Sequence, residues 1–360
     1  MRKLQRVLIM AGGTGGHVFP GLAVANHFKA QGIVVDWLGT EKGLEAKVVK
    51  EAGFSLHFIR IHGVRRTHFM NKLFAPWFLM LATLDAFKKI RQLKPDLVIG
   101  MGGFVSGPGG IAAFLLRKKL IIHEQNAKPG LTNFYLSKIA TKVLEGFPYT
   151  FKSRTNVMTV GNPVRREIED LDAPKDRFQK RAKPVRLLVF GGSLGAKAIN
   201  ELLPAALQKL PADIRPLVYH QAGELQYNPT KEAYATRGIE AQVVPFIHEM
   251  AKAYAWADMV LCRAGALTIA ELCTAGIGAI LIPYPYAVDD HQTENAKYMS
   301  NHQAAILVQQ DTLTEDVLAD MLQELCLSDE RRIAMASAAY QLRTDSVAEK
   351  ILNICREVFH

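Results

Sequence analysis

The strongest chemical signal in the sequence is a pair of glycine-rich segments, each placed directly after a short apolar run. Residues 12–17 read GGTGGH and residues 191–196 read GGSLGA. Glycine lets backbone N–H groups approach an anion, and the N-terminus of a following helix favours negative charge. The first segment is neither GxGxxG nor a GxxxxGK[ST] loop. A plain strand-to-helix turn is the alternative for either segment alone, but two such loops in one chain favour phosphate binding.

Each segment carries one side chain that can take part in chemistry. A neutral imidazole such as that of His17 can act as a general base near neutral pH, although a lone histidine is more often a structural hydrogen-bonding group. Ser193 can bind a phosphate together with backbone N–H groups. Both residues are therefore candidates for a functional site.

A third segment, RAGALTIAE at residues 263–271, also follows an apolar run and begins a predicted helix. Small residues at a helix N-terminus can cradle a diphosphate, and the Thr268 hydroxyl can add a donor. Glu271 lies one turn further, where a carboxylate can accept hydrogen bonds from a ribose diol. The alternative for Glu271 alone is a carboxylate that complements the helix dipole.

Further polar residues follow other apolar runs. We expect HEQN at residues 123–126 to emerge at the edge of a sheet, and Arg165, beyond an Asn-Pro turn, to reach a phosphate or to help hinge two domains. Asp289 and Asp290 suggest a divalent metal, but the same string reads as a helix N-cap, which we favour.

Residues 62–91 combine basic and aromatic side chains. An amphipathic segment of this kind fits a membrane interface, and a core helix with solvated ends is an equally good interpretation of the pattern. The candidate membrane contacts are Arg65, Arg66, Lys72, Phe74, Trp77 and Phe78.

These residues need a scaffold, and the pattern predicts an α/β fold. Apolar runs such as residues 7–10, 97–100 and 186–190 alternate with helical stretches, which is typical of parallel sheets covered on both faces. The pattern restarts after a polar stretch at residues 165–185. We therefore expect two similar domains, with a last helix at about 346–358 that can cross back to the first.

The composition and charge of the chain limit the classes of function that we expect. The chain has 360 residues and a net charge of +10. Residues 1–162 hold 23 basic and 8 acidic residues, a net charge of +15, whereas residues 163–360 carry −5. The four cysteines form no CxxC pair, which favours free buried thiols in a reducing compartment. We expect neither a signal peptide nor a transmembrane helix, and find no nucleic-acid-binding module.

Taken together, the motifs resemble one family. GGTGGHVFPGLAVA, MGGFVSGPGGIAA, HEQNAKPGLTN, GNPVR, GGSLGAKAIN, CRAGALTIAEL and DDHQTENA occur in order over nearly the whole chain. They look like the MurG family, the bacterial peptidoglycan N-acetylglucosaminyltransferases. The resemblance implies the GT-B fold, with two Rossmann-like doubly wound domains facing across a cleft: an acceptor and membrane-binding domain at 1–162, onto which a helix at about 344–360 packs back, and a UDP-sugar-binding domain at 163–343.

The resemblance also implies an activity. N-acetylglucosamine would pass from UDP-N-acetylglucosamine to the 4-hydroxyl of undecaprenyl-diphospho-N-acetylmuramoyl-pentapeptide (lipid I), with inversion, to give lipid II. No cofactor or metal is implied. The enzyme would sit peripherally on the cytoplasmic face of the inner membrane, on anionic lipid, with cell-wall synthesis and division proteins as partners.

Carried over motif by motif, the resemblance assigns residues to the donor site and makes His17 the candidate general base. Ile247 would face the uracil, which its backbone can hydrogen-bond, and Glu271 the ribose. The donor-site residues are Thr14, Gly15, Gly16, Asn126, Arg165, Ser193, Ile247, Ala266, Leu267, Thr268, Ile269, Ala270, Glu271 and Gln292.

Two other function classes remain open on the residues alone. A nicotinamide-dependent oxidoreductase would also use a doubly wound fold, but GxGxxG is missing. A basic, non-enzymatic scaffold on anionic lipid would use the charge of the first half and none of the site residues.

Overall fold

The structure is a computed structural model that describes residues 3–61, 75–151, 155–179, 181, 183–192 and 194–360. Arg65, Arg66, Lys72, Phe74 and Ser193 lie outside the described residues. The chain divides into two compact units: unit 1 comprises Met1–Pro163 and Ser346–His360, and unit 2 comprises Val164–Asp345.

Unit 1 is built on a seven-stranded parallel sheet with the order β3-β2-β1-β4-β5-β6-β7. The strands are β1 Arg6–Met10, β2 Val34–Gly39, β3 Ser55–Phe58, β4 Leu97–Gly100, β5 Lys119–Glu124, β6 Lys142–Glu145 and β7 Val157–Thr159. Its helices are α1 Gly15–Ala30, α2 Glu45–Glu51, α4 Ala75–Leu93, α5 Ser106–Leu115, α6 Leu131–Leu136 and α16 Val347–Phe359.

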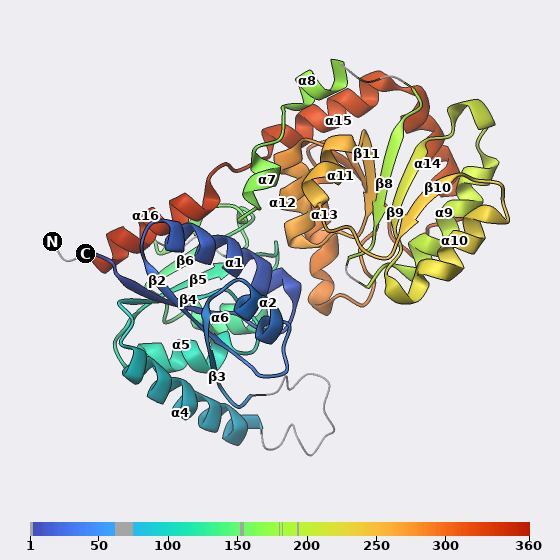
Figure 1. The fold of residues 1–360 in the computed structure, drawn as a ribbon. Coiled ribbons are helices and arrows are strands. Elements are labelled where there is room, and N and C mark those ends of the chain that lie inside the picture. The colour runs from blue at the N-terminus through green and yellow to red at the C-terminus, as the bar shows by residue number, and fades with distance from the viewer. Residues whose placement is uncertain (1–2, 62–74, 152–154, 180, 182, 193) are drawn as a thin grey trace. The chain divides into compact units, whose positions relative to one another are not determined.

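Both faces of this sheet are buried, which explains the continuous apolar runs in the sequence. Side chains alternate along β1, so that Val7 and Ile9 join one core and Leu8 and Met10 join the other. Helices α1 and α16 cover the first face, and α4, α5 and α6 cover the second (Figure 1).

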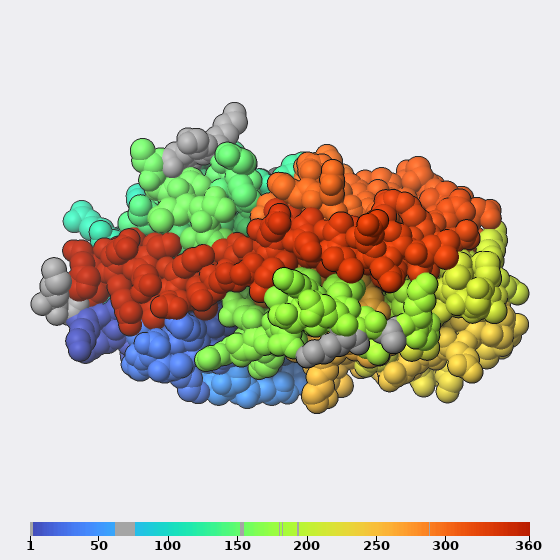
Figure 2. All heavy atoms as spheres, turned by 90° about the horizontal axis from the view of Figure 1, so that it is seen from above, coloured from blue at the N-terminus to red at the C-terminus, as the bar shows by residue number. Residues whose placement is uncertain are grey.

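The last helix of the chain belongs to unit 1. Val347, Ile351 and Leu352 of α16 are fully or almost fully buried and share a core with Val7 and Phe28. In Figure 2 these last residues, in red, lie against the blue N-terminal residues. The first unit therefore gains part of its core from the far end of the sequence.

Unit 2 repeats the same plan with a six-stranded parallel sheet in the order β10-β9-β8-β11-β12-β13. The strands are β8 Arg186–Phe190, β9 Leu217–Gln221, β10 Ala241–Val244, β11 Met259–Cys262, β12 Ala279–Leu281 and β13 Ala305–Leu307. The helices are α7 Arg166–Glu169, α8 Pro174–Gln179, α9 Lys197–Lys209, α10 Tyr227–Ala235, α11 Met250–Trp256, α12 Ala266–Ala275, α13 His291–Ser300, α14 Glu315–Leu327 and α15 Asp329–Gln341, with short 3-10 turns η2 Ala212–Ile214, η3 Glu224–Gln226 and η4 Val288–Asp290.

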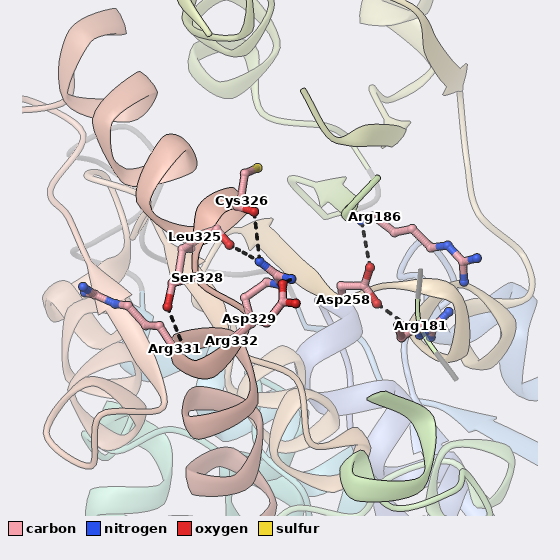
Figure 3. Close-up of polar contacts among 9 residues, drawn as sticks. All are labelled: Arg181, Arg186, Asp258, Leu325, Cys326, Ser328, Asp329, Arg331 and Arg332. Atoms are coloured by element: carbon pink, nitrogen blue, oxygen red, sulfur yellow. Dashed lines mark hydrogen bonds and ion pairs between the residues drawn. The ribbon is translucent and has the colours of Figure 1, made fainter. Parts of the chain in front are cut away.

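In both units, an aspartate just before one strand accepts a hydrogen bond from the backbone N–H at the start of the neighbouring strand. Asp96, just before β4, accepts a hydrogen bond from the Arg6 backbone N–H at 2.9 Å. Asp258, just before β11, accepts one from the Arg186 N–H at 2.9 Å and pairs with Arg181 at 3.1 Å (Figure 3). Burial raises the pKa of Asp258, and Arg181 opposes the shift. These ties set the register of neighbouring strands in both sheets.

The prediction of an α/β fold with two doubly wound parallel sheets is confirmed. The four cysteines are free and buried, as predicted. The cleft expected between the domains, and the division of substrates between them, stay predictions.

Candidate functional site

In both sheets the strand order reverses at the first strand, between β1 and β4 in unit 1 and between β8 and β11 in unit 2. Ligands of such sheets bind beyond the carboxyl ends of the strands at this switch point. The segments singled out in the sequence leave from these four strands: residues 12–17, 101–106, 191–196 and 263–268. Topology therefore brings the predicted loops to the expected edge of each sheet.

In unit 1 the first glycine loop is held by a buried carboxylate that the sequence did not reveal. Glu45, at the start of α2 and fully buried, accepts a hydrogen bond from the Gly13 N–H at 3.1 Å. Its other oxygen accepts from the Thr40 N–H at 2.9 Å and hydroxyl at 2.7 Å. A Cβ at Gly43 would lie 2.1 Å from this carboxylate, so a glycine is needed there. Glu45 thus joins the loops after β1 and β2.

The loops after β1 and β4 are in direct backbone contact. A Cβ at Gly103 would lie 2.1 Å from the Gly12 carbonyl oxygen, and Gly103 has a φ of +78°. A Cβ at Gly102 would lie 2.6 Å from Nδ1 of His17. Only glycine fits both positions, because any side chain would collide with the first loop or with the His17 ring.

The structure gives His17 a specific partner. Its Nδ1 lies 2.9 Å from Oε1 of Gln125, and Nε2 of Gln125 lies 3.1 Å from Nδ1 of His123. His123 completes the chain with its Nε2 at 2.9 Å from the Gly161 carbonyl oxygen. The expectation that the HEQN side chains emerge from the end of the strand is wrong for the first three residues, because His123, Glu124 and Gln125 are all buried.

Asn126, the fourth residue of HEQN, is partly exposed, and the buried Glu124 fixes its position. Glu124 accepts hydrogen bonds from the Asn126 N–H at 3.1 Å and from its side-chain amide at 3.2 Å. The second oxygen of Glu124 accepts from the Gly130 N–H and from Asn133. The buried carboxylate therefore fixes the loop that presents Asn126.

A pocket of about 920 Å³ opens beyond the ends of β1, β2, β3 and β4 in unit 1. Gly13 and Phe104 border it on the side of the glycine loops. Its charged lining carries four basic and two acidic side chains, so the net charge is positive; these are Lys42, Arg60, Lys88, Lys89, Glu41 and Asp85. Arg60 pairs with Asp85 at 2.9 Å and lowers the pKa of that carboxyl.

In unit 2 the third predicted segment forms the start of α12, with Gly265 as its N-cap. The Ala266 and Ile269 side chains are buried in the core, so only their backbone can face a ligand. Leu267, Thr268 and Ala270 are partly exposed. The free N–H groups of the first turn are the anion-binding feature that the sequence predicts.

Glu271 on α12 lies between two donors. Arg165 donates to its Oε1 at 3.0 Å, and the buried Tyr254 hydroxyl donates to Oε2 at 3.0 Å. Burial raises the pKa of Glu271, while Arg165 and Tyr254 oppose the shift. Burial and Glu271 also raise the pKa of Tyr254 well above its usual value, so Tyr254 keeps its proton and remains a donor. Two predicted residues, Arg165 and Glu271, are thus brought together.

Two other predicted donor residues, Ile247 and Gln292, also belong to unit 2. The Ile247 side chain is buried, and its N–H already donates to Oε1 of Gln221 at 2.8 Å. A uracil contact through the Ile247 backbone therefore has to use the carbonyl or displace Gln221. Nε2 of Gln221 donates to the Gly192 carbonyl oxygen, so Gln221 links the backbone at Ile247 to the second glycine segment. Oε1 of Gln292 accepts from the Tyr284 N–H at 2.9 Å.

The Asp289-Asp290 pair occupies the start of α13. Asp290 is the N-cap residue, but its side chain accepts from the Thr293 hydroxyl at 2.7 Å and makes no cap hydrogen bond to the backbone. Among the described residues, no group of three or more His, Cys, Asp or Glu side chains is arranged to hold a metal ion.

Comparison with known proteins decides the family. Residues 7–145 match the glycosyltransferase family 28 N-terminal domain, and residues 186–351 match the glycosyltransferase family 28 C-terminal domain. The chain belongs to glycosyltransferase family 28. The two matched segments fall within unit 1 and largely within unit 2.

Several family 28 relatives are similar over nearly the whole chain. A protein of Marinobacter nauticus is 49% identical over 353 residues, covering 98% of this chain and 97% of its own length. A protein of Pseudomonas putida is 49% identical over 356 residues, covering 99% and 98%. Both are named UDP-N-acetylglucosamine–N-acetylmuramyl-(pentapeptide) pyrophosphoryl-undecaprenol N-acetylglucosamine transferase.

Solved structures agree with this assignment. The crystal structure of Acinetobacter baumannii MurG matches with a TM-score of 0.86 and 41% identity, covering 98% of this chain and 99% of that one. A glycosyltransferase of kitacinnamycin matches with a TM-score of 0.74 at 14% identity, covering all of both chains, and so shares the fold. The GT-B class predicted from the sequence is confirmed.

The family 28 chain also exposes an apolar helix face. Trp77 is 56% exposed and Phe78 is 48% exposed, at the start of α4. Leu79, Met80 and Leu84 continue the exposed face, while Ala82, Ala86 and Ile90 of the same helix are buried. Within the described part of the chain, none of the helices combines the length and apolar character that crossing a bilayer requires.

Proposed function

We propose that this chain transfers N-acetylglucosamine from UDP-N-acetylglucosamine to lipid I, giving lipid II for peptidoglycan synthesis. The observation that carries the proposal is the near-full-length similarity, at 49% identity, to relatives named for this reaction. The sites described above supply groups of the kind that the reaction needs in each unit.

Unit 2 provides the donor site in this proposal. The N-terminus of α12 holds the diphosphate, and Glu271 accepts from the ribose hydroxyls. Two features support this: the helix begins at the switch point of the sheet, and Arg165 and Tyr254 fix the Glu271 carboxylate. Within unit 2, the family resemblance adds Ile247 and Gln292 as donor contacts.

Unit 1 provides the acceptor site. The lysines of its pocket, Lys42, Lys88 and Lys89, suit an anionic acceptor that also reaches the glycine loops. His17 acts as the general base and takes the proton of the acceptor hydroxyl. As the bond from the acceptor oxygen to the anomeric carbon forms, the bond to the phosphate breaks and its electron pair leaves with UDP. Backbone donors at a helix N-terminus stabilise that charge without reorganising.

The α4 face extends the proposal to the membrane. Exposed aromatic and aliphatic side chains at residues 77–84, on a unit whose sequence half carries +15, fit docking on an anionic lipid surface. We place the enzyme on the cytoplasmic face of the inner membrane, where UDP-sugars and lipid I meet.

A transfer assay tests the activity. Labelled N-acetylglucosamine should pass from UDP to a lipid I analogue with the wild-type protein, and Glu271→Gln should lower kcat/KM at least tenfold. Glu330→Gln, on the exposed surface of α15, is the matched control and should leave the rate unchanged. Absence of transfer by the wild type, together with thermal stabilisation by NADH and not by UDP, would support an oxidoreductase instead.

A vesicle assay tests the docking. Trp77→Ser combined with Phe78→Ser should weaken co-sedimentation with anionic vesicles and leave UDP binding intact. Leu327→Ser, at a residue of unit 2 that is 55% exposed, is the matched control. Equal sedimentation of both variants and the wild type would mean that the exposed face of α4 does not dock on the membrane and that α4 is a purely structural helix.

A further inference from the structure

The hydrogen-bonded side chains that run from the partly exposed His17 to the buried His123 and the Gly161 carbonyl fix which ring nitrogen of each histidine carries a hydrogen. At the end furthest from His17, Nε2 of His123 lies 2.9 Å from the Gly161 carbonyl oxygen. A carbonyl can only accept, so this nitrogen of His123 must carry the hydrogen. His123 is fully buried, and burial lowers its pKa, which keeps the ring neutral. A neutral ring has one N–H, so Nδ1 of His123 is an acceptor.

The tautomer of His123 in turn fixes the orientation of the Gln125 side-chain amide. An acceptor at Nδ1 of His123 requires a donor, so the NH2 group of the Gln125 amide faces it, at 3.1 Å. The same NH2 group donates to the His123 carbonyl at 3.3 Å. The amide oxygen must then point the other way, and it lies 2.9 Å from Nδ1 of His17. Gln125 is itself anchored, because Asn162 donates to its backbone carbonyl at 2.9 Å.

An amide oxygen can only accept, so Nδ1 of His17 carries a hydrogen, and the neutral ring keeps its lone pair on Nε2. We propose that His123 and Gln125 are positioning residues that hold His17 in the Nδ1–H tautomer and so present Nε2 as the base for the acceptor hydroxyl. This inference rests on the proposed function for its catalytic consequence, but the tautomer itself does not depend on the reaction.

The arrangement also suits the transfer of a proton from the acceptor hydroxyl to Nε2 of His17. When Nε2 takes the proton of the acceptor hydroxyl, the imidazolium still donates from Nδ1 to Gln125, and no bond of the chain has to change. The partner is a neutral amide, so it holds the ring without adding a charge that would trap the proton. Gly102 leaves room for the ring, because a Cβ there would lie 2.6 Å from Nδ1.

The first test reads the tautomer directly. Nitrogen-15 NMR of the wild-type protein with labelled histidine, with the His17 signals assigned by their loss in His17→Gln, should show Nδ1 protonated and Nε2 bare at a pH where the ring is neutral. In Gln125→Met, which removes the acceptor at similar volume, we expect a mixture of both tautomers. A wild-type His17 in the Nε2–H form would overturn the inference, whether or not any variant folds.

The second test reads catalysis. Gln125→Met should lower kcat about tenfold to a hundredfold, with KM for donor and acceptor within twofold of the wild type. Because a misfolded fraction also lowers apparent kcat without changing KM, kcat is calculated per folded enzyme, with the folded fraction measured from the unfolding transition. Gln323→Met, on the exposed surface of α14, is the matched control.

The outcomes separate the two claims. A wild-type protein that makes no lipid II but shows the Nδ1–H form of His17 would refute the proposed function and keep the tautomer assignment. A wild-type protein that makes lipid II while Gln125→Met or His17→Ala leaves kcat unchanged would refute the positioning role.

Discussion

Replacing Glu45 by Gln should loosen the first glycine loop, and the structure allows the cost to be worked out. One carboxylate oxygen accepts from the Gly13 N–H, and the other accepts twice from Thr40. A Gln side chain has a single acceptor oxygen, so its NH2 group must face one of these buried donors. That change removes at least one charge-assisted hydrogen bond, each contributing about 1.5–3 kcal/mol, and makes the others neutral.

The expected loss is therefore about 3 kcal/mol from the free energy of unfolding of unit 1. For a domain of this size, 1 kcal/mol shifts Tm by about 2–4 °C, which gives a decrease of about 6–12 °C. The measurement is differential scanning calorimetry, analysed for two transitions because the two units need not unfold together. Buried Trp37 reports on unit 1 by fluorescence.

Glu51→Gln is the matched control, since Glu51 ends the same helix and is exposed. It should shift Tm by no more than about 1 °C. If Glu45→Gln and Glu51→Gln gave the same Tm, the carboxylate would not be holding the loop, and the reasoning would be refuted.

Three further expectations follow from the same structure. Gly103→Ala should prevent unit 1 from folding, because the new Cβ would lie 2.1 Å from a backbone oxygen, whereas Gly32→Ala, with a similar φ of +75° and open space, should cost only about 1–2 kcal/mol in chemical denaturation. His220 is buried with its pKa lowered to about 3, so between pH 6.5 and 3 only the unfolded chain takes up its proton; unit 2 should lose about 2 kcal/mol from pH 7 to pH 5, and less in His220→Gln. An equal loss in that variant would contradict the assignment. Tyr254→Phe should raise KM for the UDP-sugar about tenfold, because Glu271 loses a donor, while KM for the acceptor stays constant.

The sequence was sufficient for the fold because the signals that set it are local. Apolar runs, glycine turns and the restart of the pattern near residue 186 all lie within short windows, and they placed the glycine loops and α12 at the ends of the right strands. Arg165 and Glu271 were both chosen from motifs, but their 3.0 Å contact joins residues 106 positions apart and could not be read from either motif.

Two features of unit 1 could not be predicted either, because they also depend on contacts between residues far apart in the sequence. Glu45 sits in a run of charged residues that resembles a solvated helix, and its burial follows from glycines at residues 12, 39 and 43 that leave space for the carboxylate. His123 and Gln125 looked like residues of a sheet edge, but contacts with His17 and Gly161 enclose them. One missed signal was available: an aspartate directly before an apolar run occurs at both Asp96 and Asp258, and it marks the strand next to β1 and β8.

The return of α16 to unit 1 has a consequence for biosynthesis. The helix supplies Val347, Ile351, Leu352, Ile354 and Cys355 to the core that β1 and α1 begin. A ribosome makes the chain from the N-terminus, so some 180 residues of unit 2 separate the two parts of that core in time. Unit 1 is synthesised first, yet its core stays incomplete until unit 2 has been synthesised and α16 has left the ribosome. The unit whose synthesis begins first therefore depends on a helix that is synthesised after all of unit 2.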